Sequence, residues 1–362
     1  MRAGLLRVSP VEFHEMRRIA EIAGNCHRER SGRCQLPTVQ PRPASGARHG
    51  EISPCGFGVW GCPALIMRRR TRGHGSMGQI SVELSKRLSN AVDRMPAFPK
   101  SVQRILELTR DINCRPKDLV AVIEKDPVIT IKVLKIVNSA YYGLPKKITS
   151  INQSVVYLGV NTLKNLALSF STMGMLPARN AAGFDVQHYL VSSLVTANLT
   201  RMLAARYANE LDPTDCYIAG LLHDFGKVVF ALYMAPEFRQ AMEMSSTENI
   251  SLHKAEEAVI GTDHTFVGAM LVKRWQFPEY LVECIDHHHA VPHVSVLAEC
   301  LFVADLIAEK LGYDSLGNVS ADGPQALPAR FGTDLDAVVA ELGDMNKLID
   351  DARMFAQTGG LK

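Results

Sequence analysis

The sequence predicts an all-α protein, on three observations. From Met77 onward, apolar residues recur at helical spacing, as at Val102, Ile105 and Leu106. Proline, glycine and capping residues fall where such segments would begin and end. Strand signals are scarce, because no paired alternating segments are joined by hairpin turns. We therefore expect one helix after another from Met77 onward.

Proline begins two of the early helices. Pro116 stands in a first turn, where a missing N–H is tolerated, and Asp126-Pro127 repeats this arrangement. The helix that follows Asp126, VITIKVLKIVNSAYYG, is expected to stop at Gly143, because glycine suits a left-handed cap.

Polar caps mark two further helices. Ser150 and Gln153 form a capping box ahead of SVVYLG, and Asn161 is expected to cap the helix TLKNLALSFSTMGML. Near the other end of the chain, LDAVVAEL and NKLIDDARMFAQ are amphipathic. We expect residues 331–362 to be a C-terminal helical extension of one or two helices that packs on the preceding core. A docking helix for a partner is the alternative.

Charge divides the chain into two unlike parts. Residues 1–76 contain 13 Arg and 5 Glu with neither Lys nor Asp, a net charge of +8, whereas residues 77–362 carry −5. A phosphate backbone attracts arrays of positive charge, so the mildly acidic main part excludes nucleic acid as its partner. No run of about 18 apolar residues or signal-type apolar stretch is present. We expect a cytoplasmic protein that binds no membrane.

Residues 1–76 resist any fold assignment. They contain Pro, Gly and Arg throughout and keep no period of 3.6 or 2, so they cannot bury a coherent face. We expect a disordered tail or mistranslated upstream sequence, with Met77 as the true start. The alternatives are an Arg-rich tail that binds something acidic and a targeting segment, for which Glu12, Glu15 and Glu21 have the wrong charge.

The eight cysteines predict no disulfide framework. Four lie in the first segment without C-x-x-C spacing, which argues against a zinc site there. The other four stand singly in or beside apolar helical patterns, where buried reduced thiols are expected. These two sets are Cys26, Cys34, Cys55 and Cys62, then Cys114, Cys216, Cys284 and Cys300.

The stretch AGLLHDFGKVVF, residues 219–230, carries the first sign of chemistry. His223 and Asp224 stand side by side at the end of an apolar run, followed by Gly226 and Lys227. A histidine beside an aspartate suits a divalent ion, and a lysine suits a phosphate.

Several ordered motifs together carry a family resemblance. The first half contains MPAFP, DP, NSAYYG and the segment 148–159, and the second contains GLLHDFGK, GTDHTFVGAMLVKRWQFPEYLVECIDHHH and LFVADLIAEKLG. Over residues 90–312 the chain resembles the HDOD family, the HD-related output domain of bacterial signalling proteins. The resemblance implies an N-terminal helical bundle packed on an HD-like helical bundle. The expected domain is 77–330, with subdomains 95–178 and 184–312.

The resemblance also implies a metal site. HD hydrolases bind iron, manganese or similar divalent ions through a first His, the His-Asp pair, further histidines and a late Asp. The pair matches His223 and Asp224, and Asp224 could bridge two ions or orient a water. Lys227 could contact a phosphate. The remaining matches are His264, His288, His289 and Asp305, with His287 as an alternative register.

The sequence departs from the hydrolases at the first His. The family pattern puts Ser192 at this position, and a neutral hydroxyl is a poor ligand for a divalent ion. His188 lies one turn earlier on the same helical face and could substitute only if the helix slid. The G-Y-P triplet of the cyclic-dinucleotide phosphodiesterases is also absent from the sequence after the histidine cluster.

Each ligand candidate has a structural interpretation as well. His223 and Asp224 could form a buried hydrogen-bonded pair that ends a helix, and His264 could be a satisfied core histidine. The histidine triplet could interact with a helix dipole.

Two functions of different class follow. The first is a non-catalytic signal-transduction output module, in which a degenerate HD-type site supports a surface for a protein partner. The second is a metal-dependent phosphohydrolase acting on a nucleotide or cyclic dinucleotide. Ser192 discriminates between them and favours the first, because an incomplete ligand shell loses control of the ion and its bound water.

Overall fold

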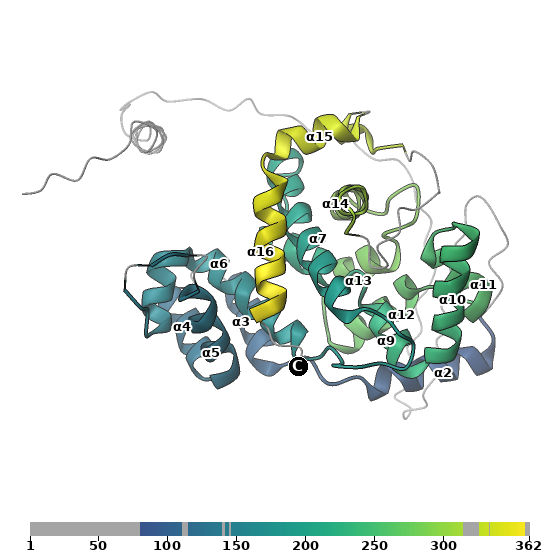
Figure 1. Cartoon of the computed structure of the whole chain (residues 1–362), viewed down its shortest axis with the longest axis horizontal. Coiled ribbons are helices and arrows are strands. Elements are labelled where there is room, and N and C mark those ends of the chain that lie inside the picture. The colour runs from purple at the N-terminus through teal and green to yellow at the C-terminus, as the bar shows by residue number, and fades with distance from the viewer. Residues whose placement is uncertain are drawn as a thin grey trace, which may run out of the picture. The chain divides into compact units, whose positions relative to one another are not determined.

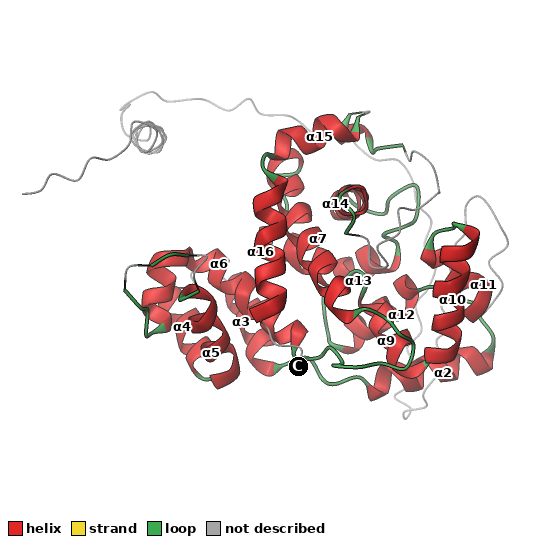
Figure 2. Ribbon diagram, viewed as in Figure 1, coloured by secondary structure: helices red, strands yellow, loops and turns green. Residues whose placement is uncertain are grey.

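The computed structural model contains helices and no strand among the residues it describes (Figures 1 and 2). The all-α prediction is confirmed. All of these residues lie in one compact unit. The expectations for residues 1–76 and for Cys114 fall outside them. The structure describes residues 80–110, 115–139, 142–144, 146–313, 326–332 and 334–358.

An N-terminal bundle is formed by four helices that follow α2. Within it, α6 packs against α4 and α5, while α2 packs instead on α9 and α12 of the second bundle. The core of the first bundle is aliphatic, with Ile105, Ile123, Val133 and Ile136 fully buried. The helices are α2 (Val82–Arg94), α3 (Lys100–Arg110), α4 (Pro116–Glu124), α5 (Pro127–Val137) and α6 (Ile151–Met173).

The segment between α2 and α3 is fastened to the second bundle. Arg274 donates a hydrogen bond to the carbonyl oxygen of Met95 (2.9 Å), and the Trp275 indole N–H donates to that of Pro96 (3.0 Å). The Phe98 ring lies 5.1 Å from the Trp275 ring. The MPAFP motif is therefore a contact between the two bundles.

The predicted starts of α4 and α5 are confirmed. Pro116 and Pro127 are the first residues of these helices. The Asp126 carboxylate accepts hydrogen bonds from the backbone N–H groups of Val128 and Ile129, each at 3.1 Å. Asp126 thus satisfies two of the donors that a helix start leaves unpaired.

The predicted end of α5 is wrong, because the helix ends at Val137 and not at Gly143. The Asn138 side-chain amide donates to the carbonyl oxygens of Leu134 (2.8 Å) and Ile148 (2.7 Å). Its oxygen accepts from the Ile148 N–H at 2.7 Å. This bridge ties the helix end to the chain ten residues on, which the sequence alone does not reveal. Gly143 does adopt a left-handed backbone, with φ of 54°.

The helix α6 contains a break. Gly159 has φ of 76° and ψ of 162°, so the turn beginning at Asn161 is already helical and the predicted cap there is wrong. Half of the predicted capping box is present. Ser150 accepts from the Gln153 N–H at 3.2 Å, whereas the Gln153 side chain accepts from the N–H of Thr149 at 3.0 Å.

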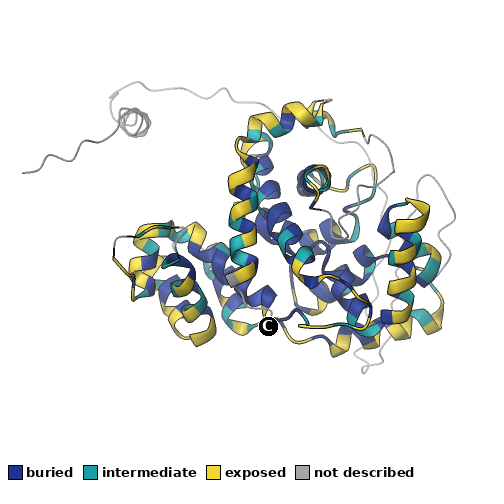
Figure 3. Ribbon diagram, viewed as in Figure 1, coloured by how far each residue is buried: buried dark blue, intermediate teal, exposed yellow. Residues whose placement is uncertain are grey.

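The second bundle surrounds two deeply buried helices, α8 and α9. Figure 3 shows the burial of α9. α7 packs against both α8 and α14, and α12 packs against α9 and α13. The helices are α7 (Val186–Tyr207), α8 (Pro213–Leu222), α9 (Phe225–Tyr233), α10 (Ala235–Glu248), α11 (Leu252–Ile260), α12 (His264–Arg274), α13 (Glu279–Asp286) and α14 (Val296–Lys310).

The segment Pro213–Tyr233 is long and apolar enough to cross a membrane by length and composition, among the residues described. It is 89% buried inside the protein. It consists of α8, the His223-Asp224 corner and α9. Protein therefore covers this segment on almost all sides, as expected of a core segment. Cys216, Cys284 and Cys300 are also buried and form no disulfide, as predicted.

Two helices near the C-terminus pack on the core. They are α15 (Leu335–Leu342) and α16 (Met345–Thr358), after a short 3-10 turn at Ala329–Phe331. α16 packs lengthwise against α7 and also contacts α5 of the first bundle (Figure 1). It therefore joins the two bundles.

Two glycines allow the second bundle to close. A Cβ on Gly220 would lie 2.6 Å from the Ala197 Cα of α7. A Cβ on Gly226 would lie 2.0 Å from the carbonyl oxygen of His264. Because real Cβ atoms do not approach other atoms this closely, glycine at these positions sets how near α8 and α9 come to α7 and α12.

We predict that Gly226→Ala destabilises the protein by about 1–3 kcal/mol or more, because α12 must move away from α9. Gly174→Ala is the control, since its Cβ would come no closer than 3.4 Å to Ser171. That change should alter the free energy of unfolding by about 1 kcal/mol at most. Denaturant unfolding of both variants measures the difference, and equal stabilities would contradict the packing argument.

Candidate metal centre

Asp224 lies at the corner between α8, which ends at Leu222, and α9, which begins at Phe225. An Asp just before a helix usually accepts hydrogen bonds from the first turn, as Asp212 and Asp263 do in this protein. Asp224 makes no such capping bond. Its carboxylate is buried and turns instead toward a group of histidines.

Three imidazoles surround one oxygen of this carboxylate. His264 Nε2 lies 3.1 Å and His288 Nε2 lies 3.8 Å from Asp224 Oδ1. His289 Nε2 lies 3.2 Å from His264 Nε2. One ligand atom from each of these four residues lies within 4.8 Å of the other three.

The other carboxylate oxygen faces a second group. His223 Nε2 lies 3.4 Å from Asp224 Oδ2 and 3.4 Å from Asp305 Oδ1. The side chain of Asp305 is 30% exposed, whereas those of His223 and Asp224 are at most 5% exposed. Asp224 is therefore shared by two sets of ligand candidates, and Asp305 forms a partly exposed edge of the cluster.

Backbone carbonyls fix the orientation of two of these rings. His223 Nδ1 lies 2.8 Å from the carbonyl oxygen of Gly220, and His288 Nδ1 lies 2.8 Å from that of Ile285. A carbonyl oxygen only accepts, so each Nδ1 carries the proton. Each Nε2 therefore points into the cluster, which is the orientation that a metal ligand needs. Although burial lowers the pKa of His223, Asp224 and Asp305 more than offset this and raise it, so a cation would displace a proton from that Nε2.

The carboxylate of Glu256, on α11, fixes the orientation of the His264 ring. Glu256 was not among the residues predicted from the sequence. Its buried carboxylate accepts from the His264 backbone N–H (2.8 Å) and lies 2.6 Å from His264 Nδ1. A signal for it exists in the sequence, because Glu256 stands between Leu252 and Ile260 on the apolar face of α11. A carboxylate on such a face requires a buried partner.

Lys227 forms an ion pair with the carboxylate of Asp224. Its ammonium donates to Asp224 Oδ2 at 2.6 Å, and its side chain is 8% exposed. Although burial by itself raises the pKa of Asp224, His223 and Lys227 hold that pKa well below its ordinary value. Burial lowers the pKa of Lys227, but Asp224 more than offsets this and raises it. The pair is therefore ionised.

The histidines differ in charge. Burial lowers the pKa of His264, but Glu256 and Asp224 more than offset this and raise it to about 9. Burial and the neighbouring His223 and His264 lower the pKa of His288 to about 3. His264 thus carries a proton between two carboxylates. Binding of a cation at this point would displace that proton.

The cluster contains buried nitrogen and oxygen atoms that lack hydrogen-bond partners and could bind a divalent ion. His223 Nε2, Asp224 Oδ1 and His288 Nε2 are all buried and lack a hydrogen bond of good geometry. Such atoms are rare in protein interiors, and here they face one another. Imidazole nitrogens with carboxylate oxygens suit iron, manganese, zinc or a similar ion.

The other candidates make contacts with residues outside this cluster. Ser192 is buried and donates to the carbonyl oxygen of Tyr313 at 2.5 Å. The ring of His188 stacks on that of Tyr313, with centroids 6.3 Å apart. His287 is 30% exposed, beside Asp286. The triplet therefore contributes its second and third histidines, and His253 of α11 stacks on His289 at 4.4 Å.

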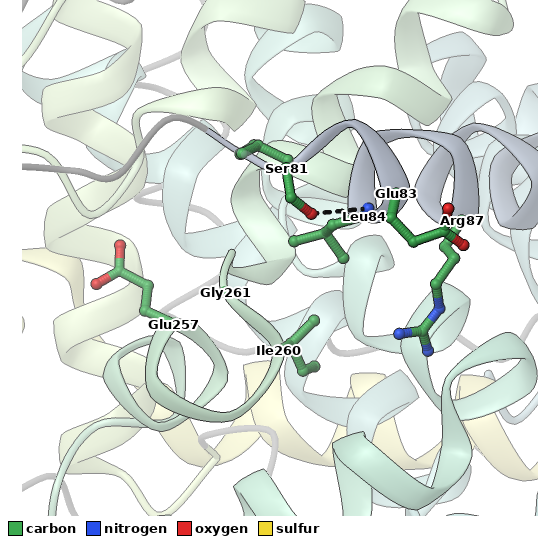
Figure 4. Close-up of a pocket in the computed structure, with 8 residues that line it drawn as sticks. Ser81, Glu83, Leu84, Arg87, Glu257, Ile260 and Gly261 are labelled. Carbon is green, nitrogen blue, oxygen red and sulfur yellow. Dashed lines mark hydrogen bonds between the residues drawn. The ribbon is translucent and has the colours of Figure 1, made fainter.

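A separate surface pocket lies between the start of α2 and the end of α11 (Figure 4). It has a volume of about 520 Å³ and is lined by none of the cluster residues. Its charged lining combines Glu83 and Glu257 with Arg87, which is paired with Glu237. The pocket offers no concentration of positive charge for a phosphate.

A bundle of helices around a buried histidine–aspartate cluster defines an HD-like helical protein. The model of the HDOD domain matches residues 95–291. The chain therefore belongs to the HDOD family. The match includes His223, Asp224 and the histidine triplet and ends before α14.

Solved structures share this fold. An HDOD domain protein of unknown function from Geobacter sulfurreducens is 25% identical, with a TM-score of 0.62, covering 77% of this chain and 97% of that one. A protein of Marinobacter aquaeolei, provisionally named a signal transduction protein, is 22% identical, with a TM-score of 0.62, over 79% and 68% of the two chains. A protein of Shewanella amazonensis, provisionally named a phosphohydrolase, is 22% identical, with a TM-score of 0.56, over 76% and 98%.

A sequence relative is known from Treponema pallidum. This uncharacterized protein is 29% identical over 219 residues, which make up 59% of this chain and 42% of the relative. The chain thus spans less than half the length of that relative.

We predict that Glu256→Gln weakens the affinity of the cluster for Mn²⁺ by about 10–100-fold, because His264 loses the carboxylate that orients it. Glu257→Gln is the matched control on the same helix, since Glu257 lines the surface pocket instead. It should leave the affinity unchanged. Calorimetric titration with Mn²⁺ measures both, and equal affinities would show that Glu256 has no role in orienting the ligand.

Proposed function

We propose that this chain is a signal-transduction output module that holds a divalent ion in the Asp224 cluster and acts through a protein partner, without catalysis. One observation carries the proposal. The side chain at the first metal-ligand position and the lysine that could contact a phosphate both make other hydrogen bonds. Ser192, at the first ligand position, donates to Tyr313, and the ammonium of Lys227 is bonded to Asp224.

The residues of the cluster would hold the ion from five separate elements. His223 and Asp305 lie on one side of Asp224, and His264, His288 and His289 lie on the other. A bound divalent ion would supply positive charge between these ligands. The Nδ1 contacts of His223, His264 and His288 keep these three rings pointed inward. The cluster would therefore tie α8, α9, α12 and α14 and the end of α13 into one unit.

The burial of the site also supports a structural role for the ion. His223, Asp224, His264 and His288 are each at most 3% exposed. A substrate needs direct access to the ion that activates its attacking water. The name given to the Marinobacter aquaeolei protein agrees with a signalling role for this fold.

The alternative function is a metal-dependent phosphohydrolase acting on a nucleotide or cyclic dinucleotide. Its specific support is Asp305, whose carboxylate is 30% exposed at the edge of the cluster. The sharing of Asp224 by two ligand sets would also suit a site with two ions. The Shewanella amazonensis protein carries a phosphohydrolase name.

We expect the purified wild-type protein to contain near-stoichiometric metal and to show no turnover of cyclic dinucleotides or nucleoside phosphates with added Mn²⁺. Asp224→Ala should remove the metal, because both ligand sets lose their shared carboxylate. Asp350→Ala, a change at an exposed Asp of α16, is the control and should retain it.

Elemental analysis and a phosphodiesterase screen on the three proteins give the result. Turnover by the wild type that Asp224→Ala abolishes would overturn the non-catalytic assignment and favour the hydrolase. A wild-type protein that holds no metal and gains no stability from added Mn²⁺ would favour a hydrogen-bonded cluster without an ion.

A further inference from the structure

The C-terminal helix α16 covers a face that both bundles share. It packs on α7 of the second bundle and on α5 of the first. Its Phe355 ring lies 6.4 Å from Phe170 of α6, and Ser139, just after α5, lies 3.8 Å from the Met354 sulfur. We name this covered surface the α5–α7 face. α16 lies beyond the residues that the HDOD model matches.

The contact surface of α16 is amphipathic, with one apolar side against the core. The residues it buries are Met345, Leu348, Ala352 and Ala356, which follow a heptad-like spacing on one side of the helix. Two of these are alanines, whereas the larger Phe355 is only partly covered. The helix thus contacts the core through two small and two larger buried side chains, and Ile349 and Met354 add further partly buried contacts.

The contact also contains a mismatched polar group. One carboxylate oxygen of Asp351 is buried without a hydrogen-bond partner. The nearby Tyr142 hydroxyl is partly buried, and this burial together with the Asp351 charge raises its pKa. A buried carboxylate oxygen that lacks a donor weakens the seating of the helix that carries it.

The connection before α16 turns at a glycine. Gly343 has φ of 95° and ψ of −144°, in a region that L side chains rarely adopt. An added Cβ there would meet no atom within 4 Å. The turn between α15 and α16 is therefore made at a residue that no neighbouring side chain packs against.

We propose that α16 is a displaceable internal occupant of the α5–α7 face, and that this face binds an amphipathic helix of the signalling partner in its place. The partner helix would carry a Leu or Met at the positions of Met345 and Leu348 and small residues at those of Ala352 and Ala356. This is helix-in-groove recognition, with α16 showing what the face accepts. The inference deepens the proposed function by naming where the partner binds.

Release of α16 would also remove a contact with Tyr313, which is linked to the metal cluster. Arg353 of α16 lies 5.6 Å from the ring centre of Tyr313, which follows α14. The carbonyl oxygen of Tyr313 accepts the hydrogen bond from Ser192. α14 carries Asp305, so the helix that covers the face is linked through Tyr313 to the exposed edge of the cluster.

The test uses the full chain and a labelled peptide of residues 344–358 with the native sequence. The double change Ala352→Glu and Ala356→Glu in the full chain should expel its own α16 and leave the face free. The peptide should then bind this variant, measured by fluorescence anisotropy. Wild-type chain should bind it at least about tenfold more weakly, because the tethered helix competes at high effective concentration.

Gln357→Glu in the full chain is the charge control, because Gln357 lies on the exposed side of α16. It should behave as the wild type does. A peptide that carries Ala352→Glu should not bind the double variant. Equal binding of the native peptide by the wild type and the double variant would overturn the proposal, and so would a folded double variant that binds no peptide.

If the double variant fails to fold, hydrogen exchange on the wild-type protein tests the proposal instead. Amides of α16 should exchange at least about tenfold faster than those of α7 and α8, as expected for a locally opening element. Protection of α16 equal to that of α7 would overturn the proposal. The probe is the chain's own helix, so these results do not depend on metal content. Failure here would leave the proposed output function testable by its own metal and turnover assays.

Discussion

The second bundle is organised around one buried carboxylate, that of Asp224. An isolated charge at such a depth is strongly unfavourable, so the surrounding chain must supply compensating groups. It does so from three directions, with the Lys227 ammonium at 2.6 Å, His264 at 3.1 Å and His223 at 3.4 Å. Removing any one of these leaves the others imperfectly paired.

This requirement explains the local backbone. Asp224 gives up the usual capping role before α9 so that its carboxylate can turn inward. α12 must approach closely enough for His264 to reach it, and this approach depends on the absence of a side chain at Gly226. Glu256 then holds His264 from behind through two bonds. The motif GLLHDFGK therefore has two roles. It supplies candidate metal ligands, and its second glycine lets α9 and α12 pack closely.

The sequence predicted the helical class and the residues that converge, because ordered motifs and periodic apolar faces are local features. It did not reveal Glu256, whose role depends on the turn at Gly261 that brings α11 back beside α12. The end of α5 was missed for a similar reason, since Asn138 bonds to a residue ten positions away. Contacts between residues far apart in the sequence cannot be predicted from the residue spacing within one helix.

The central claim is that His223, His264 and His288 turn Nε2 into the cluster because an acceptor outside it holds the Nδ1–H of each ring. Long-range ¹H–¹⁵N NMR correlation on ¹⁵N-histidine protein, freed of metal by a chelator, tests this directly. The account predicts a protonated Nδ1 at both His223 and His288, with the Nε2 resonance of each lost or shifted on adding Zn²⁺. Nε2–H tautomers at both residues, unchanged by Zn²⁺, would contradict it.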